Sequence, residues 1–159
     1  QIPVLLAECD CSSNTHCGAV ARLCLATGAR WSEANNLPPS NLLDDRVIFS
    51  DTNHGRVRVV PIKPSLVAEF RSLAYPVGQR LFSSCKGAFR KAVERSGIHL
   101  PDGQLTHVLR HTFASHFLIN GGDILALQRI LGHSDLKVTM RYAHLAPDYM
   151  AKVRDLSPI

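Results

Sequence analysis

The sequence lacks the features that mark several large classes of protein. No segment is apolar enough to span a membrane, and no secretion signal opens the chain. It has no internal repeat and no low-complexity segment, which argues against a solenoid or a disordered tail. An initiator methionine is also missing. We therefore expect residues 1–159 to be a single domain, cut from the C-terminal part of a longer protein.

The cysteines do not form a recognisable metal site or disulfide framework. Their number is odd, and the spacings match no zinc pattern (Cys9, Cys11, Cys17, Cys24 and Cys85). We predict reduced thiols in a cytosolic protein, with no bound metal.

The composition describes a foldable, mildly basic domain. Apolar residues make up 45% of the 159 residues, enough for one domain with a real core. The formal net charge is +5, and arginine outnumbers lysine by 13 to 5. Arginine makes bidentate contacts to phosphate that lysine cannot make. The balance favours a polyanionic partner without identifying it.

Hydrophobic periodicity and turn-forming residues predict a mainly α fold with a small antiparallel β-sheet, an α+β class. Segments 46–50 and 56–62 flank a turn-forming run and should form a β-hairpin, with a third short strand near 80–82. Tyr142 is placed on a helix that begins at Ser134. Helices are predicted over 3–10, 17–27, 64–73, 84–96 and 107–119, with shorter ones beginning near Ser32, Asp123, Ser134 and Pro147.

Four polar residues in the last third of the chain have spacings that no fold requires. His107 and Arg110 are three residues apart and share one helix face, which we expect to point away from the core toward a phosphate. His133 follows Gly132 in a turn between helices, where a side chain can point into a cleft. Tyr142 comes nine residues later. Each has a plain alternative: a solvent-exposed pair, a linker histidine and a packing tyrosine.

Two further positions extend this set. Arg30 lies at a junction between helices, where it either binds an anion or forms a structural ion pair with Glu33. Tyr149 is the second candidate nucleophile. His111 lies one turn after His107, but no third ligand accompanies the two, so we assign His111 no functional role.

Together these residues resemble the catalytic domain of the tyrosine recombinases, most closely the integrases of temperate bacteriophages. Segment 26–33 matches the region of the family's first arginine, and segment 107–112 matches its His-x-x-Arg box. Segment 131–134 and the following Tyr142 match the last box, including the spacing. The resemblance covers nearly the whole chain and implies the tyrosine recombinase catalytic-domain fold.

The resemblance implies a site-specific recombinase that cuts and rejoins DNA through a covalent 3′-phosphotyrosine, for integration and excision of viral DNA in the host bacterial cytoplasm. Tyr142 would attack the phosphorus, with His107 as general base. Arg30 and Arg110 would hold the non-bridging oxygens, and His133 would donate a hydrogen bond to the phosphate. Because such clamping can replace metal ions, no cofactor is expected.

The hairpin turn departs from the family pattern. The family usually carries a lysine there as general acid, and the aligned position is Asn53. We hypothesise that His54 or Arg56 contacts the DNA near the leaving group instead.

The resemblance also implies partners. These are double-stranded DNA attachment sites, further copies of the chain in a tetramer on DNA, and host or phage proteins that bend DNA, with no membrane. The tail, residues 147–159, would either dock on a neighbouring protomer or fold back on its own core.

Two other functions fit parts of the sequence. Residues 123–142 have the pattern of a helix-turn-helix, so the chain could bind DNA without catalysis. A nicking-closing enzyme of the type IB topoisomerase kind would share the chemistry without strand exchange. Formation of a covalent protein–DNA adduct separates catalysis from binding alone.

Overall fold

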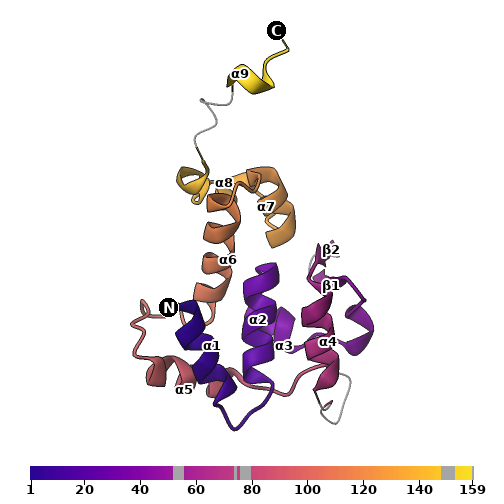
Figure 1. Cartoon of the computed structure of the whole chain (residues 1–159), viewed down its shortest axis with the longest axis vertical. Helices are drawn as coiled ribbons and strands as arrows, with labels where there is room; N and C mark the ends of the chain where they lie inside the picture. Colours follow the sequence, from indigo (N-terminus) through magenta and orange to yellow (C-terminus); the bar gives the residue numbers. More distant parts are fainter. Residues whose placement is uncertain (52–55, 74, 76–79, 148–152, 159) are drawn as a thin grey trace.

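The chain folds into a mostly helical domain with one two-stranded antiparallel sheet, as the sequence predicts (Figure 1). The computed structural model describes every residue except 52–55, 74, 76–79, 148–152 and 159. Within that part, no helix has the length and hydropathy needed to cross a membrane. The elements are α1 (Ile2–Asp10), α2 (Cys17–Thr27), α3 (Trp31–Asn35), η1 (Pro39–Asn41), β1 (Arg46–Asp51), β2 (Arg56–Pro61), α4 (Pro64–Ser72), α5 (Lys86–Ser96), α6 (His107–Ile119), α7 (Ile124–Leu131), α8 (Leu136–Met140), η2 (Ala143–Leu145) and α9 (Val153–Leu156).

The larger hydrophobic core lies among α1 to α5 and the hairpin. Its largest fully buried side chains include Leu23, Phe70, Phe82 and Phe89. The hairpin contributes one face only, because side chains alternate along a strand. In β1, Val47 and Phe49 are buried, and the register pairs Phe49 with Arg58 on β2.

A smaller core lies among α6, α7 and the segment after α8. It consists of Ala114, Leu118, Leu127, Leu131 and Tyr142. In Figure 1, α7 and α8 lie at the upper end of α6, above α2 and the hairpin. The polar residues that the sequence singles out lie where these two parts meet.

Glycines end two helices at positions that matter for this junction. Gly28 follows α2 with φ +66° and Gly132 follows α7 with φ +70°, a backbone region that residues with a Cβ rarely adopt. A Cβ on Gly28 would also lie 2.5 Å from Cδ1 of Phe113. α2 therefore packs closely against α6 at its C-terminal end.

The predicted third strand near 80–82 is wrong. Among the described residues, β1 and β2 are the only strands, and Leu81 and Phe82 are buried in an irregular segment. Leu81 N–H donates to the carbonyl of Leu37 at 2.7 Å, and Ser83 N–H donates to Nδ1 of His16 at 2.9 Å. Scattered partners thus satisfy this backbone, so the apolar pair is buried without joining the sheet.

The boundaries of the C-terminal elements also differ from the prediction. Asp135, not Ser134, caps α8, accepting a hydrogen bond from the Lys137 N–H at 2.9 Å. α8 ends at Met140, so Tyr142 lies just beyond it. The helix predicted from Pro147 is observed only as α9, and residues 148–152 lie outside the described residues. Leu156 on α9 is 73% exposed.

Candidate active site

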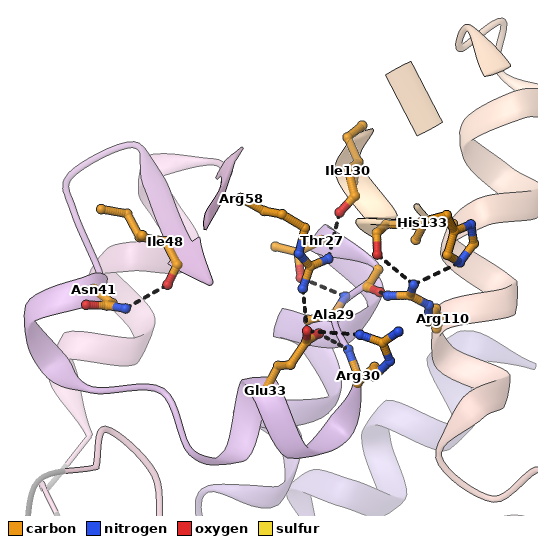
Figure 2. Close-up of polar contacts among 12 residues, drawn as sticks. Thr27, Ala29, Arg30, Glu33, Asn41, Ile48, Arg58, Arg110, Ile130 and His133 are labelled. Carbon is orange, nitrogen blue, oxygen red and sulfur yellow. Dashed lines mark hydrogen bonds and ion pairs between the residues drawn. The ribbon is translucent and has the colours of Figure 1, made fainter. Parts of the chain in front are cut away.

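Arg110 is buried where α2, α6 and α7 meet, so the prediction that its side chain points away from the core is wrong. One guanidinium nitrogen donates to the Gly28 carbonyl at 2.7 Å. The other donates to the Leu131 carbonyl at 2.7 Å and lies 3.0 Å from Nε2 of His133 (Figure 2). Both carbonyls lie at helix C-terminal ends, which attract a cation. The arginine therefore joins the two parts of the domain.

The guanidinium is surrounded by more positive than negative charge. Burial, together with the positive charges of Arg30 and Arg58, lowers the pKa of Arg110 to about 10, although Glu33 acts in the opposite direction. Arg110 stays protonated at neutral pH but lies in a site with excess positive charge. An anion would relieve that excess.

His133 is held by Arg110 on one side and α8 on the other. Because arginine has no acceptor atom, Nε2 of His133 accepts the hydrogen bond from Arg110. The ring proton is then on Nδ1, which donates to Oγ1 of Thr139 at 2.9 Å. Burial lowers the pKa of His133 to about 4, with Arg110 and Arg30 contributing in the same direction. The ring is therefore neutral at neutral pH.

This environment predicts a pH-dependent stability. The folded pKa of His133, about 4, lies below its ordinary value of 6.5, so between these values the unfolded chain binds a proton that the folded chain does not. The free energy of unfolding should therefore fall as pH is lowered from about 6.5 to about 4. Urea unfolding across this pH range measures the free energy of unfolding. It should decline less steeply for His133→Asn than for the wild-type chain, and the decline that remains comes from carboxylates, which titrate in both proteins. Parallel pH profiles for the two proteins would contradict it.

Glu33 links Arg30 to Arg58. Its carboxylate accepts from the Arg30 N–H at 2.7 Å and from the Arg30 guanidinium at 3.3 Å. It also accepts from Arg58 at 2.6 Å (Figure 2). The Arg30 side chain is 48% exposed and lines the same pocket as Arg110. The structural ion pair and the anion-binding role are therefore compatible.

Arg58 is a site-supporting residue that sequence reasoning missed. It lies on β2 opposite Phe49, its guanidinium carbon is 5.2 Å from the centroid of that ring, and its side chain is 8% exposed. It donates to the Ile130 carbonyl at 2.8 Å, and a Cβ on Gly132 would lie 2.6 Å from its Cδ. Arg58 thus packs the hairpin against the turn that carries His133. Strand alternation places it on the core side, the one signal that could have identified it.

The Tyr142 side chain is buried in the smaller core, and the residue also lines the pocket that Arg110 and Arg30 share. The residue is 8% exposed, and its hydroxyl is hydrogen-bonded to Nδ1 of His111. Burial raises the pKa of Tyr142, while Arg141 and Arg110 lower it. The other candidates differ: Tyr75 is 54% exposed, and Tyr149 lies outside the described residues.

The predicted residues converge on one pocket of about 350 Å³. Its described lining contains three arginines and three histidines but no carboxylate, so it suits an anion. We call it the cationic pocket; it is lined by Arg30, Gly103, Gln104, His107, Arg110, His111, His133, Val138, Arg141 and Tyr142. His107 is exposed at the first position of α6, whereas His111, unassigned from the sequence, touches the tyrosine.

The structure does not describe the side chains of the hairpin residues that the sequence singles out. Asn53 and His54 lie outside the described residues, as does the side chain of Arg56, whose backbone begins β2.

All five cysteines are free thiols. In the part of the chain that the structure describes, no three His, Cys, Asp or Glu residues are grouped to hold a metal ion.

Comparison with known proteins identifies the family. Residues 1–148 match the model of the phage integrase family. The chain belongs to this family. Over 159 residues it is 54% identical to the integrase of Escherichia phage 186. The matched segment covers 100% of this chain and 46% of that protein. The integrase-family domain thus spans about half the length of the curated relatives it matches.

Solved structures agree with the fold of this integrase-family domain. The catalytic domain of bacteriophage HP1 integrase matches it with a TM-score of 0.91 and 48% identity, over 99% of this chain and 92% of that one. XerH site-specific recombinase bound to its difH substrate matches with a TM-score of 0.70 and 21% identity, over 99% and 52% of the two chains. The latter match shows a common fold alone. The predicted catalytic-domain fold is confirmed.

Proposed function

We propose that the chain is the catalytic domain of a site-specific DNA recombinase, a phage integrase acting in the bacterial cytoplasm to integrate and excise viral DNA. One observation carries the proposal. Tyr142 lines the cationic pocket together with three arginines and three histidines, and no carboxylate is among the described lining residues. A phosphodiester held there would meet a nucleophile and several donors at once.

The residues can perform the reaction without a cofactor. Arg110 and Arg30 would bind the non-bridging oxygens and stabilise the charge that builds up on them. Tyr142 Oη would form a bond to phosphorus while the bond to the 5′ oxygen breaks, leaving a 3′-phosphotyrosine and a 5′-hydroxyl. His133 would give up its contact with Arg110 and donate to a phosphate oxygen, because a bound phosphate raises the pKa of a neighbouring histidine.

A covalent adduct separates this function from its alternatives. In a nicked duplex, the short 5′-hydroxyl strand diffuses away after cleavage, so the protein stays joined to DNA and migrates slowly in a denaturing gel. We expect this adduct on a duplex from an attachment site. Absence of an adduct on any such duplex would favour the helix-turn-helix reading. Relaxation of supercoiled plasmid without strand exchange would favour the nicking-closing reading.

The leaving oxygen needs a proton, and we propose that His54, or Arg56 at the start of β2, supplies it. Replacing both with alanine should slow cleavage by about 10²-fold or more, in the range that general acids contribute. A duplex with sulfur in place of the 5′ bridging oxygen should restore the rate, because a thiolate leaves without a proton. Lys63→Ala, beyond β2, is the matched control. Unchanged cleavage of the ordinary duplex by the double variant would contradict the assignment of the general acid to His54 or Arg56.

We propose double-stranded DNA attachment sites as substrate, bound by a tetramer with DNA-bending accessory proteins. The net charge of +5 supports a DNA partner, and XerH, which shares the fold, was solved bound to difH substrate. The tail would dock on a neighbouring protomer. In support, Val153 and Leu156 are 54% and 73% exposed, and α9 lies apart from the other helices in Figure 1.

A further inference from the structure

The contact between Tyr142 and His111 joins two segments far apart in the sequence. His111 projects from α6, and Tyr142 follows α8 in the smaller core. The hydroxyl is hydrogen-bonded to Nδ1, the rings are 5.8 Å apart between centroids and inclined by 46°. Both residues line the cationic pocket. Of the described side chains, His111 is the one hydrogen-bonded to the phenol oxygen.

The direction of this hydrogen bond follows from the two environments. Burial lowers the pKa of His111 below 6.5, and Arg141, His107 and Arg110 lower it further. Burial raises the pKa of Tyr142 above 10.0. At neutral pH the phenol therefore keeps its proton and donates, and the ring accepts at Nδ1 with its own proton on Nε2. The lone pair of Nδ1 thus points at the proton that must leave during attack.

We propose that His111, rather than His107, is the general base that removes the phenolic proton of Tyr142, an inference that rests on the proposed function. As the oxygen–phosphorus bond forms, the proton moves from Oη to Nδ1. The 5′ oxygen leaves with a proton from its own general acid. Religation reverses both transfers: the attacking 5′-hydroxyl gives its proton back to that general acid, and His111 returns its proton to the departing phenolate.

The neighbouring charges make this base responsive to substrate. Without DNA, Arg110, Arg141 and His107 disfavour a charged His111. A phosphate bound to Arg110 and Arg30 would offset those charges and strengthen the base when the reaction needs it. His107, exposed at the N-terminal end of α6, would then be available to the phosphate oxygens. One pocket would thus use two histidines for two different tasks.

A second cavity offers a route to chemical rescue. His111 also lines an open pocket of about 550 Å³ with Leu25, Ile98, Leu100 and Thr112. Removing the imidazole in His111→Ala would leave a space that this pocket connects to solvent. Added imidazole should enter it and restore adduct formation at least tenfold. The same addition should do nothing for Tyr142→Phe.

The decisive comparison uses leaving groups. We expect His111→Gln to form the adduct about 10²-fold more slowly than the wild-type chain, with the ordinary nicked duplex. The defect should remain with the 5′ bridging sulfur duplex, because the sulfur removes the need for a general acid and not for a base. His116→Gln, on the exposed side of the same helix, is the matched control and should cleave normally. Circular dichroism establishes that each variant is folded.

Three results would overturn the assignment. Cleavage by His111→Gln at the wild-type rate would leave the proposed function intact and remove His111 from it. Loss of the defect with the sulfur duplex would place His111 on the leaving-group side. A wild-type chain that forms no adduct would overturn the proposed function and the base together.

Discussion

Replacing Arg110 with alanine is expected to reduce adduct formation by about 10³- to 10⁵-fold, the range over which an arginine contributes to phosphoryl transfer. The guanidinium is the most deeply buried cation of the cationic pocket, and it already lies in a site with excess positive charge. A phosphate would therefore gain much from this one side chain. The rate of adduct formation on a nicked duplex is the measurement.

The same change should also destabilise the fold. It leaves the carbonyls of Gly28 and Leu131 without their partner, and a buried acceptor that loses its partner costs about 1–3 kcal/mol. Arg110→Lys keeps the charge but cannot bridge both carbonyls, so it should fall between alanine and wild type. Arg129→Ala, an exposed arginine on α7, is the control that should change neither quantity. A stable, fully active Arg110→Ala would refute both roles.

Replacing Tyr142 with phenylalanine is expected to abolish the covalent adduct, a loss of at least about 10⁴-fold, because phenylalanine offers no nucleophilic oxygen. The ring keeps its place in the smaller core, and only the hydrogen bond to His111 is lost. The free energy of unfolding should therefore change by about 1 kcal/mol or less. Binding to intact duplex DNA should persist, since the arginines remain.

Much of the architecture follows from local sequence signals. The periodicity between 107 and 119 and the capping Asp123 place α6 and α7 correctly. The alternating segments on either side of residues 51–55 form the hairpin. These are local choices made by a few neighbouring residues. Leu81 and Phe82 are apolar because they are buried, and burial does not require a hydrogen-bonded neighbouring strand. Their apolar character therefore does not predict a strand.

The geometry of the site depends on contacts that sequence spacing does not encode. The i, i+3 rule places His107 and Arg110 on one helix face, but only the packed ends of α2 and α7 decide that Arg110 is buried. The sequence offers an ion pair of Arg30 with Glu33 as one alternative, whereas the contact of Arg58 with Glu33 depends on how the hairpin packs against α7. The hydrogen bond between His111 and Tyr142 joins residues 31 positions apart in the sequence, and no local sequence pattern predicts it.

The most direct test of the account is to identify the residue that carries the DNA. The trapped adduct would be digested with nuclease and trypsin, and the peptide bearing a 3′-phosphonucleotide would be sequenced by tandem mass spectrometry. Cleavage after Arg141 gives a peptide that begins at Tyr142 and also contains Tyr149. We predict the modification on the first residue of that peptide. A modification on Tyr149, on Tyr75 or on a serine would contradict the account.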